Sequence, residues 1–293
     1  MSKGRILVTG ASGQVGWHLC RYLTAQGYRV TGTYHANQPV IPGVELRPLD
    51  LSNPQGLSDF AGYDYFAVIH AAALTSVDRC EKTPDLARRV NSEATRLLAG
   101  LFHPETRFIY FSTDLVFDGE RGGYRESDPI NPVNVYAGTK AGGEQAVLAR
   151  PGGVVVRLAL SYGFATPFSS GFTAVMKDCL DAGKPVRLFV DQFRTPVYVG
   201  DIVRAIERLI TQQPQHQVYH LGGAERVSRW EFGCRFADVF GYDRALLLPT
   251  KAAESGLVVR GKDCSLDCSR FANEFFQTCE VLEGLRRMQQ GVY

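Results

Sequence analysis

The sequence predicts an α/β fold in which helices cover both faces of a parallel sheet, because short, almost continuously apolar runs alternate with longer helical patterns. The alternation is clearest in the first half of the chain. The expected strands are residues 5–9, 28–34, 44–51, 66–70, 107–112 and 153–158. Helices are expected at about 15–26 and 84–101, and again around Tyr136. In such doubly wound sheets, ligands bind beyond the carboxyl ends of the strands.

Three glycines stand at equal spacing where the first strand ends and the first helix begins: Gly10, Gly13 and Gly16. We expect Gly10 to permit the tight turn, Gly13 to let a pyrophosphate approach the backbone, and Gly16 to let helix and strand pack closely. The phosphate would lie on backbone amides at the positive end of the helix. The spacing differs from the common G-x-G-x-x-G, so the strand-turn-helix context carries the prediction of a Rossmann-type dinucleotide site.

The rhythm of strands and helices loosens after about residue 160, where glycines, aromatic residues and prolines cluster. Only residues 201–211 and 229–240 look clearly helical there. We therefore predict an α/β fold with a Rossmann-type doubly wound parallel sheet and a smaller C-terminal substrate lobe. Residues 1–160 would form the dinucleotide-binding domain, completed by elements near 197–222, and residues 161–293 would form mainly the substrate-binding lobe.

The loop after the second strand bears on the choice of cofactor. A carboxylate at this point would bind the ribose hydroxyls of NAD, but residues 32–37 contain none. His35, Thr33 or Asn37 could instead donate hydrogen bonds to a 2′-phosphate, although no arginine lies in this loop. We predict that the cofactor is NADP(H). The alternative is that the protein uses both NADP(H) and NAD(H). Asp50, at the next strand end, would either accept from the adenine amino group or cap the following turn.

Composition restricts the classes of partner. The 293 residues carry a net charge of +2, and no long basic run is present, so neither nucleic acid nor an anionic membrane surface is an expected partner. No stretch approaches the roughly 20 apolar residues that span a bilayer. The seven scattered cysteines predict reduced thiols, and Cys264 and Cys268 lack a nearby second pair of ligands, so no metal site is expected. We expect a cytoplasmic protein.

Tyr136 and Lys140 are four residues apart at the start of a predicted helix and therefore share one of its faces. Reduction of a carbonyl needs a proton donor at the developing alkoxide. A phenol serves poorly at neutral pH unless a cation stabilises its anion, and Lys140 supplies such a cation. Thr113, at the end of the preceding strand, can hydrogen-bond the substrate oxygen. The three residues predict a catalytic trio.

Several motifs together resemble one enzyme family. They are the glycine turn, His70-Ala-Ala-Ala73, Ser112-Thr-Asp114, Tyr136-x-x-x-Lys140 and the run from Asp191 to Pro196. In this order they resemble the extended short-chain dehydrogenase/reductases, and within them the dTDP-4-dehydrorhamnose reductase family. The resemblance covers about residues 4–210.

The resemblance implies catalysis by Thr113, Tyr136 and Lys140, with reduction of a keto group on a nucleotide-linked deoxysugar by a nicotinamide cofactor. With the glycine turn, it places the cofactor along a set of residues that lie mostly at strand ends. The predicted cofactor-binding residues are Gly10, Gly13, Gln14, Val15, Gly16, His35, Asp50, Leu51, Ala71, Ala72, Ala73, Ser112, Tyr136 and Lys140, with Asn91 as a further candidate. The predicted substrate-binding residues are Asp114, Leu115 and Arg194.

The chain departs from the family pattern where a sugar would bind. Leu115 stands where the rhamnose enzymes carry tyrosine, and Leu160 and Ser161 stand before Tyr162 where a tryptophan is usual. Arg194 replaces a small residue, and would either grip a diphosphate or pair with a neighbouring carboxylate. These changes affect the assignment of the sugar more than that of the activity class.

Two alternatives remain open at this stage. A dehydratase or epimerase of the same fold would place a second carboxylate after Asp114, where this chain has Leu115. A non-catalytic role is the other alternative, because the regulatory subunit of methionine adenosyltransferase is similar to sugar-nucleotide reductases and acts as a partner protein. The helices beside such a sheet often bury a dimer face, so a homodimer is expected. His70 is expected to be a core or cofactor-proximal histidine and not a base.

Overall fold

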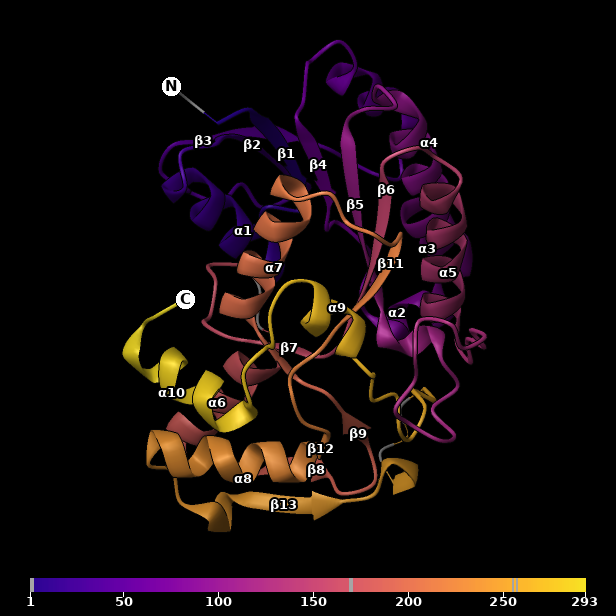
Figure 1. Ribbon diagram of the computed structural model, residues 1–293. Coiled ribbons are helices and arrows are strands. Elements are labelled where there is room, and N and C mark those ends of the chain that lie inside the picture. Colours follow the sequence, from indigo (N-terminus) through magenta and orange to yellow (C-terminus); the bar gives the residue numbers. More distant parts are fainter. Residues whose placement is uncertain (1–2, 169–170, 255, 257) are drawn as a thin grey trace.

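The computed structural model describes residues 3–168, 171–254, 256 and 258–293 (Figure 1). Its larger lobe is built on a seven-stranded sheet in the order β11-β6-β5-β4-β1-β2-β3, and all neighbouring strands pair in parallel. The strands are β1 (Arg5–Thr9), β2 (Arg29–Tyr34), β3 (Val44–Pro48), β4 (Ala67–His70), β5 (Arg107–Thr113), β6 (Gly153–Leu158) and β11 (Val218–Leu221). The predicted doubly wound α/β fold is confirmed.

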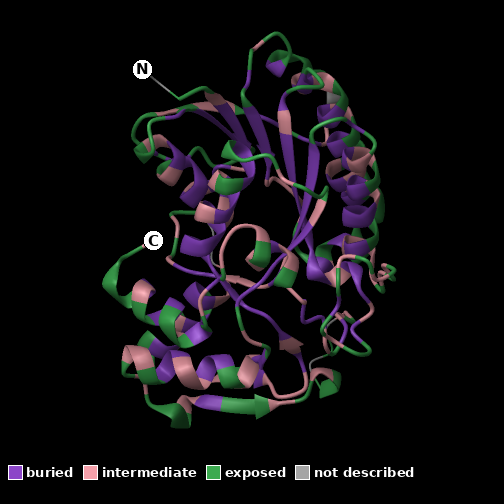
Figure 2. Ribbon diagram, viewed as in Figure 1, coloured by how far each residue is buried: buried purple, intermediate pink, exposed green. Residues whose placement is uncertain are grey.

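Helices cover both faces of this sheet (Figure 1). On one face lie α1 (Gln14–Ala25) and α7 (Val199–Thr211), and on the other lie α2 (Val77–Lys82), α3 (Pro84–Arg88), α4 (Ala94–Leu101) and α5 (Val135–Leu148), with the 3₁₀ segment η1 (Pro54–Phe60). Figure 2 shows the central strands buried along most of their length. Two apolar clusters sandwich the sheet: Ile6 and Val8 pack toward α1 and α7, and Leu7 packs toward α4. Burial of both faces explains the near-continuous apolar strands.

Two predicted elements differ from the structure in detail. The helix expected at 84–101 is interrupted by a π-helical turn, η2 (Arg89–Glu93), between α3 and α4. Buried Asn91 lies in this turn, and such insertions often occur at functional sites. The third strand ends at Pro48 and not at 51, because Asp50 closes a turn by accepting hydrogen bonds from the Ser52 amide and hydroxyl.

The smaller lobe is formed mainly by the second half of the chain, from residue 161 onward. Its elements are β7 (Ser161–Tyr162), α6 (Phe172–Asp181), β8 (Val186–Phe189), β9 (Phe193–Arg194), β10 (Val197–Tyr198), β12 (Val227–Ser228), α8 (Arg229–Phe240), η4 (Arg244–Leu246), β13 (Leu247–Thr250), η5 (Ala252–Glu254) and α10 (Val281–Gln290). Helix α9 (Ser269–Glu274) packs on β11 in the larger lobe. Helix α8 begins with a capping box in which Ser228 and Glu231 exchange hydrogen bonds. Because α7 and β11 return to the larger lobe, the chain crosses between the lobes more than once. The division at residue 160 stays a prediction.

Three further observations concern the part of the chain that is described. No helix there is long and apolar enough to cross a membrane. No group of three or more His, Cys, Asp or Glu side chains there could hold a metal ion. The seven cysteines are all free, and Cys264 and Cys268 have separate hydrogen-bond partners.

Candidate active site

A cavity of about 760 Å³ lies at the carboxyl ends of the central strands. It lies at the point where the strand order reverses, because β1 pairs with β2 on one side and with β4 on the other. The cavity brings together all the residues predicted to bind cofactor or substrate or to catalyse, except Asn91 and the candidate 2′-phosphate donor Asn37. They are Gly10, Gly13, Gln14, Val15, Gly16, His35, Asp50, Leu51, Ala71, Ala72, Ala73, Ser112, Thr113, Asp114, Leu115, Tyr136, Lys140 and Arg194.

The glycine turn forms one wall of the cavity, and its backbone leaves no room for side chains. Gly10 has a φ of +77°, and a Cβ on it would lie 2.9 Å from the backbone of Ala72. A Cβ on Gly16 would lie 2.2 Å from the Gly10 carbonyl oxygen. Helix α1 begins after Gly13. Because glycine has no side chain, the first amides of the helix are not capped by that residue. Those amides therefore suit the pyrophosphate of a dinucleotide.

The loop after β2 forms the next part of the wall. The His35 side chain is exposed, and its Nε2 lies 3.8 Å from Asp50 Oδ2. Thr33, by contrast, is buried, and its hydroxyl accepts a hydrogen bond from the Gly10 amide. Asp50 holds the turn to Ser52 while it also lines the cavity. The turn-capping interpretation of Asp50 is thus present in the structure, and an adenine contact is compatible with it.

Thr113 and Tyr136 meet at the inner end of the cavity. Thr113 ends β5, and Tyr136 lies in the first turn of α5, which Asn134 caps by accepting from the Ala137 amide. Burial raises the pKa of Tyr136, and its hydrogen bond with the Thr113 hydroxyl opposes that rise. The phenol is therefore protonated at neutral pH, and stabilising its anion requires a nearby cation.

Lys140 lies one helical turn beyond Tyr136 and is buried. Its Nζ lies 4.1 Å from the centroid of the Tyr110 ring. Burial lowers the pKa of Lys140 to about 7, while Glu144 opposes the shift. A lysine with this pKa gains or loses its proton near neutral pH, so a bound anion would favour its charged form.

Ser112 precedes Thr113 and carries a buried hydroxyl. Within the described residues this Oγ has no hydrogen-bond partner, and Ser112 lines the cavity. A buried polar atom without a partner is costly, so it marks a place where a ligand group fits. The residues present therefore fit a nicotinamide dinucleotide on two independent grounds, the glycine cradle and the orphaned serine hydroxyl.

Asp114 and Arg194 form a buried pair beside Thr113. Asp114 Oδ1 accepts from the Thr113 hydroxyl, and Arg194 Nε lies 3.5 Å from Asp114 Oδ2. Burial raises the pKa of Asp114, and Arg194 is the strongest of the groups that oppose the rise. The other Arg194 donors bind the carbonyl oxygens of Phe193, Arg260, Gly261 and Lys262. Of the two interpretations of Arg194, the structure favours pairing with a carboxylate over a free grip on a diphosphate.

Two residues support the cavity from behind without lining it. The Asn91 side chain bonds both the amide and the carbonyl of Leu74 and also donates to Thr139. It therefore holds the loop after β4 rather than reaching the cavity. His70 is fully buried between the hydroxyls of Thr9 and Thr95, and burial lowers its pKa to about 3. Of the two expected settings for His70, the structure shows the core one.

Sequence reasoning missed three arginines that line the same cavity: Arg79, Arg229 and Arg260. They come from α2, from the start of α8 and from the segment before Cys264. None of them belongs to a recognisable motif, and only folding brings them to the cavity.

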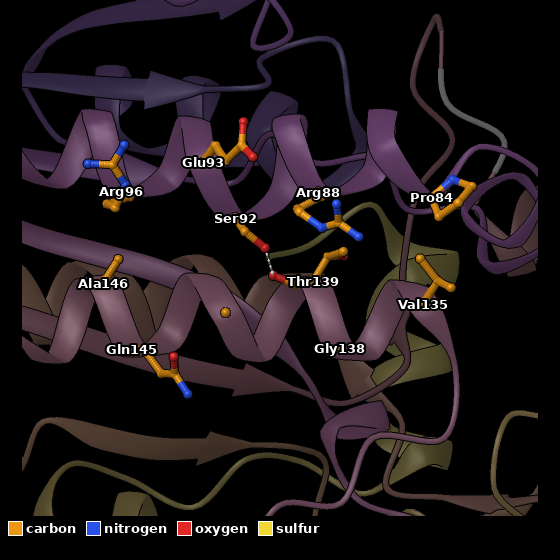
Figure 3. A pocket seen from close by; sticks show the side chains of 11 residues that line it. Pro84, Arg88, Ser92, Glu93, Arg96, Val135, Gly138, Thr139, Gln145 and Ala146 are labelled. Atoms are coloured by element: carbon orange, nitrogen blue, oxygen red, sulfur yellow. Dashed lines mark hydrogen bonds between the residues drawn. The ribbon is translucent and has the colours of Figure 1, made fainter.

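A second cavity, of about 730 Å³, lies between the α3–α4 segment and α5 (Figure 3). Ser92 donates to the Thr139 carbonyl across it, and Arg88, Glu93 and Arg96 project from the upper helix in this view. None of the predicted site residues lines it. It therefore takes no part in the candidate active site.

The fold and the site together define a short-chain dehydrogenase/reductase of the extended class. The family model described as RmlD substrate binding domain matches residues 4–292. The chain belongs to this family.

Relatives of known sequence or structure agree with this placement. The chain is 35% identical to a probable low-salt glycan biosynthesis reductase, Agl14, of Haloferax volcanii, over 94% of each chain. It is 31% identical to methionine adenosyltransferase 2 subunit beta of Xenopus laevis, over 91% of this chain and 81% of the relative. A solved dTDP-4-dehydrorhamnose reductase of Bacillus anthracis, in complex with NADP, superposes with a TM-score of 0.85 at 27% identity, covering 99% of this chain and 100% of that one.

Proposed function

We propose that the protein is an NADP(H)-dependent reductase that reduces a keto group on a nucleotide-linked deoxysugar. The single observation that carries this proposal is the convergence of Thr113, Tyr136 and Lys140 with the glycine turn in one cavity. The relatives that are named as reductases, and the NADP bound to one similar structure, support it.

The cofactor would lie along the glycine turn. The amides at the start of α1 would hold its pyrophosphate, and the loop of residues 71–73 would lie beside it. Lys140 and the Ser112 hydroxyl would bind the nicotinamide end. When bound, the reduced cofactor supplies the hydride.

The chain's own residues manage the proton. Tyr136, protonated at neutral pH, would donate its phenolic proton to the oxygen of the substrate carbonyl as negative charge develops there. Lys140 would stabilise the phenolate that remains. Thr113 would hold the same oxygen, and it is itself oriented by its hydrogen bond to Asp114. The substrate contacts that we propose are with Asp114 and Leu115, and Arg194 would mainly hold Asp114 in place.

The preference for NADP(H) rests on the β2 loop. His35 is exposed at the cavity wall and free to approach a 2′-phosphate, and the residues after β2 offer no carboxylate that would repel it. Asp50 Oδ2 lies 3.8 Å from His35 Nε2, and this carboxylate would also permit a ribose or adenine contact. Use of NAD(H) as well is therefore the alternative.

A non-catalytic role is the second candidate, because a regulatory subunit is among the relatives. The dehydratase alternative gains nothing from the geometry, since Leu115 lines the cavity where a second carboxylate would be needed.

The test is a fluorescence titration of the purified protein with NADPH and NADH, followed by a panel of 4-keto sugar nucleotides while cofactor oxidation is recorded. Oxidation of NADPH with one member supports the reductase and names its substrate. Tight NADPH binding with no turnover on any member favours the regulatory role. Failure to bind either cofactor contradicts both.

A further inference from the structure

Three arginines with buried or partly buried side chains, Arg194, Arg229 and Arg260, line the cavity together with the carboxylate of Asp114. They come from β9, α8 and the loop before Cys264, so no local pattern of the sequence unites them. Two of the three have anionic partners within the protein. Arg194 pairs with Asp114, and Arg260 pairs with Asp78 of α2. Both are thus largely compensated.

Arg229 is the exception. It is the first residue of α8, and its backbone amide donates to the Gln192 carbonyl. Its guanidinium stacks on the Phe172 ring, 4.4 Å from the centroid. Among the described residues, its buried Nη1 has no hydrogen-bond partner, and no ion pair of Arg229 is present. A buried donor of a charged group is expensive to leave without a partner.

The charges around Arg229 raise the energetic cost of leaving its Nη1 without a partner. Burial lowers the pKa of Arg229 to about 9, the positive charge of Arg194 lowers it further, and Asp114 opposes the shift. The group remains charged at neutral pH while its one nearby carboxylate is shared with Arg194. The site therefore lacks one negative charge.

Asp114 connects this position to the proposed chemistry. Its Oδ1 accepts from the Thr113 hydroxyl, and Thr113 in turn interacts with the Tyr136 phenol. The guanidinium of Arg229 thus lines the same cavity as this carboxylate and interacts with it electrostatically.

We propose that Arg229 binds an oxyanion of the substrate through its unpartnered Nη1, while Phe172 holds the guanidinium plane. The inference rests on the proposed function, because it assumes a sugar nucleotide in this cavity. Two sources supply such an oxyanion: the diphosphate that joins nucleotide and sugar, or a carboxylate on the sugar ring. Either would provide the missing negative charge with a charge-assisted hydrogen bond.

The experiment compares Arg229→Met with the wild-type protein. Methionine keeps an apolar side chain against Phe172 and removes the charge. Arg226→Met is the matched control, because Arg226 stacks on Phe193 and pairs with Asp263 close by in the chain but does not line the cavity. The dissociation constants of inorganic pyrophosphate, UDP-glucose and UDP-glucuronic acid would be measured by calorimetry, with and without NADPH.

We expect Arg229→Met to weaken binding by about 10- to 100-fold, and Arg226→Met to change it by less than about 2-fold. Equal losses for pyrophosphate and both sugar nucleotides assign the oxyanion to the diphosphate. A loss confined to UDP-glucuronic acid assigns it to the sugar carboxylate. Unchanged affinity for every probe, or a wild-type protein that binds none of them at millimolar concentration, overturns the inference.

Two further measurements separate this result from others. A parallel NADPH titration should give the same affinity for Arg229→Met and wild type. A wild-type protein that does not bind NADPH would contradict the proposed function and not this inference. If Arg229→Met does not fold, as judged by thermal unfolding, Arg229→Lys replaces it. Lysine keeps the charge but not the planar fork, and we expect it to weaken binding less than methionine would.

Discussion

Glu144 of α5 and Arg157 of β6 form a buried, doubly hydrogen-bonded pair. Arg157 Nη2 lies 2.9 Å from Glu144 Oε2 and Arg157 Nε lies 3.1 Å from Oε1, with side chains 7% and 2% exposed. Glu144 is one turn beyond Lys140 and is the group that opposes the lowering of the Lys140 pKa. The pair therefore joins β6 to α5 and also sets the charge environment of the proposed catalytic lysine.

Removing this carboxylate should be costly. Glu144→Gln leaves Arg157 buried without a counter-charge, and we expect the free energy of unfolding to fall by about 3–5 kcal/mol. The control is Glu283→Gln, which breaks a half-exposed pair with Arg287 in α10 and should cost less than about 1 kcal/mol. Urea unfolding of both variants measures the difference, and similar costs for the two would contradict the role given to the buried pair.

NADPH binding should weaken as the pH rises. The pKa of Lys140 is lowered to about 7, so the lysine loses its positive charge above that pH in the cofactor-free protein. A bound phosphate-bearing anion favours the protonated form, and the dissociation constant should therefore rise with pH, at most about tenfold per unit. In Lys140→Met this dependence should disappear and binding should be weak throughout. A wild-type dissociation constant that stays flat between about pH 6 and pH 9 would show that Lys140 does not contribute its charge.

The lowered pKa of Lys140 also affects the stability of the fold. Stability should increase with pH, whereas NADPH binding should weaken. The unfolded chain holds a proton on Lys140 up to its ordinary pKa, whereas the folded chain releases it near pH 7. Between these values the unfolded state binds more protons, so this residue's contribution to stability increases as the pH rises and is lost as the pH falls through the folded pKa. Comparing wild type with Lys140→Met by unfolding at several pH values isolates this contribution.

Tyr136→Phe should abolish most turnover while cofactor binding stays intact. The phenolic proton is lost but the ring remains in α5, so we expect a fall in kcat of about 100- to 10,000-fold and an NADPH dissociation constant within about 2-fold of wild type. Tyr242→Phe is the control, since its hydroxyl bonds Asp181 in the smaller lobe. Full activity in Tyr136→Phe on the true substrate would exclude this residue as the proton donor.

Gly16→Ala should damage both the fold and the cofactor site. The new Cβ would lie 2.2 Å from the Gly10 carbonyl, so the glycine turn must shift, at a cost of about 1–3 kcal/mol, and NADPH binding should weaken at least about tenfold. Gly100→Ala in α4 is matched to it, because no described atom lies within 4 Å of its Cβ. That variant should bind NADPH normally and gain up to about 1 kcal/mol of stability. Equal NADPH affinities in the two variants would contradict the proposed binding of the cofactor at the glycine turn.

His35→Ala tests the choice of cofactor. If the exposed imidazole contacts the 2′-phosphate, the variant should bind NADPH several-fold to about tenfold more weakly, with NADH unchanged. His103→Ala, an exposed histidine away from the cavity, should alter neither. Equal weakening for both cofactors would place His35 against a part of the dinucleotide that they share.

Features that depend on neighbours in the chain were predicted well. The parallel sheet, the glycine turn and the helix that carries Tyr136 and Lys140 are all set by local backbone periods, which the pattern of apolar residues and glycines records directly. The smaller lobe was predicted less completely. Helices α6 and α10 were missed, although Val281, Leu285 and Met288 of α10 are buried at helical spacing and would have indicated an amphipathic helix.

The sequence by itself therefore determined the fold class, the glycine turn and the shared helix face of Tyr136 and Lys140, because each depends on local backbone periods. Only the tertiary structure decided what the isolated polar side chains do. Arg194 is occupied because the carbonyl oxygens of Arg260 and Gly261 approach it from more than sixty residues away. Among the described residues, Arg229 Nη1, in contrast, has no hydrogen-bond partner. The reason is physical: a guanidinium has five donors, and which of them are satisfied depends on long-range packing that no local spacing encodes.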